Sequence, residues 1–174
     1  MKSVRFPRTG IVIAVPLVVV VGCPGVSPDD MSMAPSSPSA AKLFTMITET
    51  DPYEAWAQFP EVEGIIESAA PHGPMARIFI NSIVEAALND FTGRLPDGSV
   101  IVKENLGENT SEKADALTIM WKVEGFDPGN NDWFWTNVTP SGNVNAEGSI
   151  EGCLSCHSGS RDNDFVFVHQ FSSE

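Results

Sequence analysis

The chain has 174 residues, with 23 acidic and 10 basic side chains, and carries a formal net charge of −13. That length predicts a single folded domain. The acidity excludes a protein that uses its charge to hold nucleic acid or an anionic lipid surface.

The first 22 residues have the pattern of a secretory signal. Three basic residues stand within the first eight positions, and an apolar run interrupted only by Pro16 follows from 10 to 21. This order is typical of signal peptides, and the run is shorter than the about 20 residues that a membrane-spanning helix needs. The run ends in VVGC at 20–23, which resembles a bacterial lipobox. We therefore expect cleavage before Cys23 and lipid on that cysteine, with an ordinary signal peptide and a spare thiol as the alternative.

Export would place the protein in the periplasm, or anchor it by lipid to a membrane, of a bacterium. Loss of residues 1–22 would take away three positive charges and move the formal charge from −13 to −16. Residues 23–39 are rich in proline and serine and have few large apolar side chains, so they cannot build a core. We interpret them as a flexible tether and expect the folded domain to occupy residues 40–174.

The first elements of that domain are predicted to be helical. Residues 40–50 place Leu43, Met46 and Ile47 on one face of a helix. An aromatic stripe at 53, 56 and 59 continues at helical spacing, which usually indicates core. Further along, Ser82 and Glu85 have capping-box spacing, which predicts a helix from 82 to about 90.

Several short segments alternate or are rich in branched and aromatic residues, which predicts strands. In one of them, Val100 and Val102 share one face while Ile101 and Lys103 share the other. The pattern indicates an α+β fold, mainly β, with an antiparallel sheet and a few packed helices. The predicted strands are 77–81, 99–104, 117–123, 133–138 and 164–171.

The residues Cys153, Cys156 and His157 form Cys-x-x-Cys-His, the attachment pattern of a c-type haem. Each thiol can add to one vinyl group of a porphyrin, and the adjacent histidine can bind the iron as proximal ligand. Half of a zinc site and a redox Cys-x-x-Cys are the alternatives. A closed zinc site takes four ligands, usually as two pairs, and no second pair is present. The sequence therefore predicts one covalent haem c per chain, near the C-terminus.

From about residue 51 onward, the order and spacing of several segments resemble the cytochrome P-460 family, which includes the cytochromes c-prime-beta. These segments are PHG at 71–73, RIFIN at 77–81, PDGSVIVKE at 96–104, MWK at 120–122, DWF at 132–134, the haem motif at 153–157 and DFVF at 164–167.

The resemblance implies a largely β fold with a five-coordinate haem, whose distal face is open to small nitrogen species such as hydroxylamine and nitric oxide. In the P-460 members, a lysine is bonded to a porphyrin meso carbon and hydroxylamine is oxidised. The matching lysine is Lys103. The c-prime-beta relatives lack this cross-link and bind nitric oxide in an apolar pocket without established turnover. By alternation alone, Lys103 is an ordinary lysine at a strand end, and its competitor Lys122 is expected on the surface.

Three further residues are candidates for the distal side of the haem. Glu147 precedes Cys153 by six residues and is our candidate proton acceptor, with surface solvation as the alternative. Arg77 and Phe79 share one face of their strand and are expected to line the distal pocket, although Phe79 is equally consistent with core.

Electron-transfer cytochromes fill the sixth iron position with methionine or histidine. The candidates are Met75, Met120, His72 and His169, and the resemblance implies that none of them binds iron. Three functions stay open: a hydroxylamine-oxidising enzyme, a nitric oxide binder and a plain electron-transfer protein. The expected partners are a small nitrogen ligand, a redox partner such as another cytochrome, and a second copy in a homodimer. We expect no nucleic acid, and membrane contact only through the lipid.

Overall fold

The structure, a computed structural model, describes residues 37–107 and 113–171. The predicted signal peptide, Cys23 and most of the predicted tether lie outside this part of the chain. The first helix among the described residues begins at Ala40. None of the helices in the described ranges is long and apolar enough to cross a membrane.

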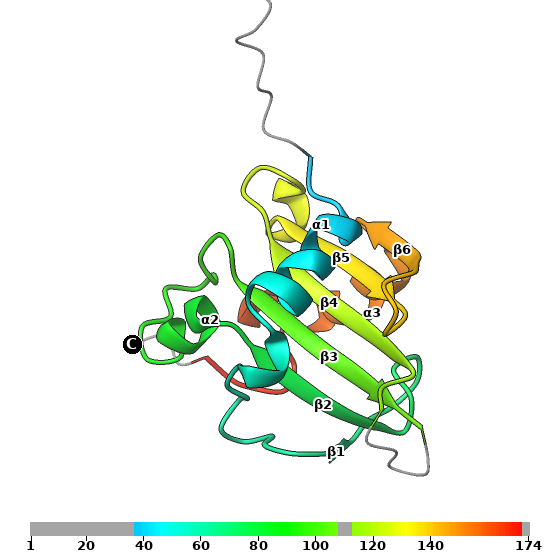
Figure 1. The fold of residues 1–174 in the computed structure, drawn as a ribbon. Helices are drawn as coiled ribbons and strands as arrows, with labels where there is room; N and C mark the ends of the chain where they lie inside the picture. Colours follow the sequence, from blue (N-terminus) through cyan, green and yellow to red (C-terminus); the bar gives the residue numbers. More distant parts are fainter. Residues whose placement is uncertain (1–36, 108–112, 172–174) are drawn as a thin grey trace, which may run out of the picture. The chain divides into compact units, whose positions relative to one another are not determined.

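A six-stranded antiparallel sheet forms the centre of the domain, and its strands lie side by side in chain order. Three α-helices accompany it, so the fold is mixed α+β, as predicted. Figure 1 shows α1 across one face of the sheet and α3 behind the other. The strands are β1 Ile66–Glu67, β2 Met75–Ile80, β3 Val100–Leu106, β4 Ala116–Lys122, β5 Trp133–Val138 and β6 Val144–Gly148.

The helices are short, and side chains or tight turns define their ends. Ser39 caps the first α-helix, where its side chain accepts a hydrogen bond from the Lys42 amide. The α-helices are α1 Ala40–Thr45, α2 Ser82–Ala87 and α3 Glu151–His157. Short helical segments of other types are η2 Met46–Thr50, η3 Tyr53–Ala55, η4 Pro128–Asn130 and η5 Ser158–Asn163.

The sheet separates two cores because alternate side chains of each strand point to opposite faces. On the face toward α1, Val100 and Val102 pack with the buried Leu43 and Ile47. The opposite face carries Ile101, which belongs to a core that also includes residues of α3. The predicted alternation of β3 is therefore confirmed, and it leaves Lys103 on the side of α3.

Two predicted elements in this part of the chain are wrong. The aromatic stripe forms only the three-residue turn η3, because the backbone is already extended at Trp56. As a result, Tyr53 and Trp56 pack on the α1 side, while Phe59 packs in the other core. The predicted strand 164–171 does not form, since Asp164 and Phe165 adopt left-handed backbone angles, with φ of 52° and 67°, which break an extended chain.

The start of α2 differs from the predicted capping box. Its N-cap is Asn81, whose side-chain oxygen accepts a hydrogen bond from the Val84 amide at 3.2 Å. The same oxygen accepts a second bond from the Val100 amide at 3.1 Å. Asn81, and not Ser82, therefore caps α2, and its side chain connects the start of α2 to the start of β3.

Candidate haem site

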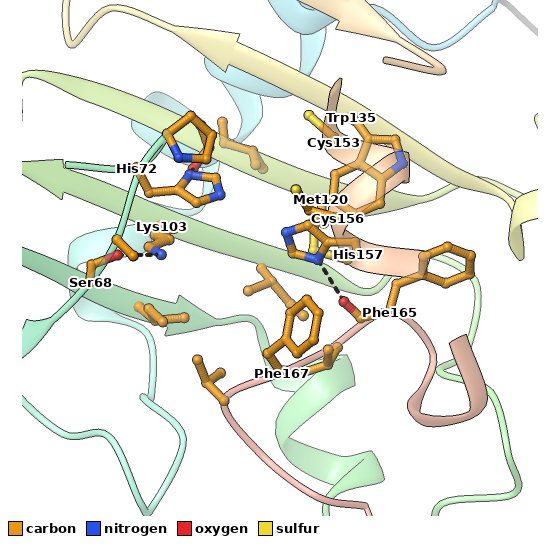
Figure 2. A pocket seen from close by; sticks show the side chains of 18 of the residues that line it. Ser68, His72, Lys103, Met120, Trp135, Cys153, Cys156, His157, Phe165 and Phe167 are labelled. Carbon is orange, nitrogen blue, oxygen red and sulfur yellow. Dashed lines mark hydrogen bonds between the residues drawn. The ribbon is translucent and has the colours of Figure 1, made fainter. Parts of the chain in front are cut away.

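A pocket of about 360 Å³ lies on the α3 side of the sheet, with a mainly apolar lining. Its walls come from the loop before β2, from strands β2 to β5, from α3 and from the segment after η5. Figure 2 shows its side chains converging from these segments. They include Ser68, Pro71, His72, Ile78, Ile101, Lys103, Thr118, Met120, Trp135, Cys153, Cys156, His157, Phe165 and Phe167.

Helix α3 brings all three residues of the haem motif to this pocket. Cys153 and Cys156 are three positions apart, so they lie on one face of the helix, and both thiols are free. Cys153 is half-buried and Cys156 is exposed. Burial raises the pKa of the Cys153 thiol, and the neighbouring Cys156 raises it further. Because neither cysteine is in a disulfide, both sulfurs can react with a group that enters the pocket.

The imidazole of His157 is oriented by a backbone hydrogen bond. Its Nδ1 lies 2.7 Å from the carbonyl oxygen of Phe165. Because a carbonyl only accepts, the proton sits on Nδ1, and Nε2 keeps its lone pair for a metal. Burial lowers the pKa of His157 and so favours the neutral imidazole that iron binds. The rings of Trp135 and Phe167 flank it at 4.8 and 5.3 Å between centroids.

Lys103 reaches the same pocket from β3. Its Nζ donates a hydrogen bond to Ser68 Oγ at 2.8 Å. Burial lowers the pKa of Lys103 to about 8, so a substantial fraction of the amine is neutral slightly above neutral pH. The lysine that the resemblance singled out is therefore a partly desolvated amine, in one pocket with His157.

His72 also lines the pocket, a position that no pattern in the sequence predicted. Its ring centroid lies 6.2 Å from that of His157, with the two planes nearly perpendicular at 88°. Its Nδ1 lies 3.3 Å from Thr118 Oγ1, which donates to Asn105 Oδ1. Burial, and then the positive charges of Lys103 and His157, lower the pKa of His72 to about 4. Its place in a Pro-His-Gly loop gave no signal of this position.

Gly73 allows the loop that carries His72 to lie against the end of β3. Its φ is +79°, a left-handed angle that favours glycine. A Cβ atom there would come within 2.8 Å of the Leu106 carbonyl oxygen. This close approach explains the glycine after His72.

Three predicted distal residues do not reach the pocket. Glu147 is exposed, and its Oε2 accepts a hydrogen bond from the Ala40 amide at 2.6 Å, which places it on the α1 side. Arg77 pairs with Glu104 at 2.5 Å, and Phe79 packs edge-on against Tyr53. All three lie on the α1 face of the sheet. On β2, Ile78 is the residue that lines the pocket.

Lys122 also differs from expectation, because it is buried rather than on the surface. Its side chain is only 1% exposed, and its Nζ lies 2.7 Å from Asp164 Oδ2. The ammonium also lies 3.9 Å from the centre of the Trp133 ring. On β4 it shares a face with Met120, but its partner Asp164 is 42 residues away in the chain.

The residues of the pocket fit a covalently held haem. Two thiols and one imidazole with a free Nε2 line an apolar pocket, which suits a flat, largely apolar ring. The indole nitrogen of Trp135 is buried and has no hydrogen-bond partner in the described part of the chain, as expected of a donor that meets a bound group. Within residues 37–107 and 113–171, no three histidine, cysteine or carboxylate side chains converge to hold a metal ion by themselves.

The other candidate iron ligands are placed unequally. Met120 and His72 line the pocket, whereas Met75 and His169 are not among its lining residues. His169 Nδ1 is hydrogen-bonded to Glu61 Oε2 at 2.8 Å, and the His169 ring stacks on Phe59.

Comparison with known proteins agrees with this site. The family model described as Cytochrome P460 matches residues 51–168, which include the pocket loop, the strands β1 to β6 and the haem motif. A search of curated proteins gave no match. Proteins of the matched family bind haem c and act on nitrogen species. Since the match covers more than half of the chain, the protein belongs to the cytochrome P460 family.

Proposed function

We propose that the chain is an exported mono-haem c-type cytochrome that oxidises small nitrogen species such as hydroxylamine and passes the electrons to a redox partner. The observation that carries this proposal is the presence of Lys103 and His157 in one apolar pocket with both motif cysteines. A lysine amine beside the haem site is what the cross-linked members of the resembled family require.

Each pocket residue has a distinct role in this proposal. Cys153 and Cys156 attach the haem, and His157 holds the iron through the Nε2 left free by its bond to Phe165. A bound haem would supply redox-active iron. The apolar walls formed by Ile78 and Ile101 would limit the access of water to the pocket.

Lys103 is proposed to bond to the porphyrin edge through its Nζ. Forming this bond would remove one hydrogen from the amine and one from a ring carbon, and an oxidant of the peroxide class would take up the two electrons. The lowered pKa of Lys103, about 8, favours the neutral amine that can form the bond. The hydrogen bond to Ser68 holds the amine within the pocket.

Peptide mass spectrometry of the holoprotein tests the cross-link. We expect one species in which the porphyrin joins the Lys103 peptide to the 153–157 peptide. Its mass should be two hydrogens lower than the summed masses of the free Lys103 peptide and the haem-bearing 153–157 peptide. The Lys103→Met variant should retain haem on the 153–157 peptide alone, and the peptide of the exposed Lys42 is the internal control. A Lys103 peptide free of porphyrin, even after peroxide treatment, would contradict the proposed cross-linked enzyme. The alternative of a nitric oxide binding protein would then remain.

One observation favours electron transfer as a second candidate function, namely the position of His72. Zinc–imidazole bonds are about 2.0–2.1 Å, so two imidazoles on opposite sides of a metal ion with bonds of this length have centroids roughly 6 Å apart. The observed separation of 6.2 Å between His72 and His157 is compatible with this arrangement. A sixth ligand would close the iron position that nitrogen chemistry needs.

Optical and paramagnetic resonance spectra separate these two functions. We expect high-spin, five-coordinate ferrous haem in the wild type and in His72→Ala, with nitric oxide binding in both. The control is His169→Ala, because His169 does not line the pocket. A low-spin wild type that becomes high-spin only in His72→Ala would establish the electron-transfer alternative.

A further inference from the structure

A buried polar network lies behind the haem pocket and centres on Asp164. Lys122 Nζ donates to both carboxylate oxygens of Asp164, at 2.8 and 2.7 Å, and to the Asn131 carbonyl at 2.8 Å. The side chains of Lys122 and Asp164 are 1% and 0% exposed. The carboxylate also accepts the Leu95 amide at 2.7 Å and the Asn131 side chain at 2.9 Å. Donors from separate segments thus converge on one carboxylate.

The same network fixes an unusual stretch of backbone. Asp164 and Phe165 both have left-handed φ angles, of 52° and 67°, which residues other than glycine rarely adopt and which must be held by their surroundings. The Asp164 carbonyl accepts the indole N–H of Trp133 at 3.0 Å. The side chain and the main chain of Asp164 are therefore both anchored to the sheet.

The anchored residue is the immediate neighbour of the group that orients His157. The Phe165 carbonyl accepts the hydrogen bond from His157 Nδ1 at 2.7 Å. A carbonyl on this nitrogen fixes the rotation of the imidazole and increases its donation to the metal. The direction of that carbonyl depends on the turn at 164–165.

We infer that Lys122 and Asp164 are positioning residues for the proximal iron ligand, acting through the Phe165 carbonyl on His157. The inference rests on the proposed ligation of haem iron by His157. It gives the buried lysine of β4 a role at the haem without any contact with it. The sheet would thereby set the strength of the iron–histidine bond.

The test compares the buried Lys122–Asp164 pair with a partly buried ion pair on the opposite face of the sheet. The double variant Lys122→Met, Asp164→Asn removes the pair behind the haem without leaving an unpaired charge. The matched control, Arg77→Met with Glu104→Gln, removes the pair on the α1 face, which the structure places away from the pocket. The single variant Lys122→Met is measured alongside as a second test of the same pair. Resonance Raman spectra of the ferrous holoproteins and their midpoint potentials are measured, together with the urea midpoints.

We expect the Lys122–Asp164 variant to show a lower iron–histidine stretching frequency and a higher midpoint potential than the wild type, because a weakened bond at Nδ1 makes the imidazole a poorer donor. The control should lower the urea midpoint and leave both haem properties unchanged. An unchanged frequency and potential in the Lys122–Asp164 variant would overturn the inference alone. A haem-loaded wild type with no iron–histidine band would overturn the ligand assignment and the inference together.

Discussion

Replacement of both Cys153 and Cys156 by alanine is expected to yield a protein without thioether-linked haem. The two thiols lie on one face of α3 and line the pocket, and a c-type haem is held through such a pair. Thioether-linked haem should fall from one per chain to none, as judged by mass spectrometry of the peptide that holds residues 153–157. Haem that dissociates on denaturation can still be held through His157.

The control for this experiment is Ser155→Ala, because Ser155 lies between the cysteines and is exposed. It should load haem as the wild type does. Covalent haem that persists in the double cysteine variant would have to be attached elsewhere, and adding Lys103→Met should then remove it. Persistence in this triple variant would contradict both proposed attachment points.

Replacement of Trp133 by alanine is expected to cost about 3–5 kcal/mol of unfolding free energy, the usual range for a fully buried large aromatic side chain. Trp133 is 0% exposed. Its indole donates to the Asp164 carbonyl at 3.0 Å, and its ring lies beneath the Lys122 ammonium. Because small domains have about 5–15 kcal/mol in total, this loss would remove a large part of the stability.

Urea unfolding of the purified holoproteins measures the effect. The matched variant is Trp121→Ala, since Trp121 is on the neighbouring strand but only half-buried and on the α1 side. It should cost clearly less than Trp133→Ala. Equal losses for the two tryptophans would contradict the central place of Trp133 in the core behind the haem.

The local patterns of the sequence were sufficient for much of the sheet. Alternation in β3 correctly separated Ile101 and Lys103 from Val100 and Val102, because a strand alternates its faces whatever it pairs with. The spacing of Cys153, Cys156 and His157 likewise predicts haem attachment from neighbouring residues alone. Both predictions depend on neighbours in the chain and on no distant contact.

The relation between strands could not be read in the same way. Arg77 and Phe79 do share one face of β2, as predicted, but this is the face toward α1 and not the face that lines the pocket. The register pairs Ile78 with Lys103 and Phe79 with Val102, and a shift of one residue would have exchanged the two faces. The sequence fragments of β2 and β3 do not by themselves determine this register.

Distant partners account for the remaining differences. Lys122 is buried because Asp164 neutralises it, and Asp164 turns left-handed where a strand was predicted. His72 enters the pocket because Gly73 allows its loop to approach Leu106 closely. Each outcome depends on a contact between segments, and a single segment carries no sign of its partner.

The strand order of the sheet has a consequence for the order of events during folding. Every strand after β1 pairs with the strand that precedes it in the chain, so the sheet can form step by step between successive segments, and pairing of successive segments is associated with faster folding than pairing of distant ones. The haem helix α3 begins only at Glu151, after β6 has ended. A chain that emerges N-terminus first can therefore assemble the sheet that forms one wall of the pocket before Cys153 and Cys156 appear. The proposed haem attachment would then take place on a preformed half-site rather than on an unstructured chain.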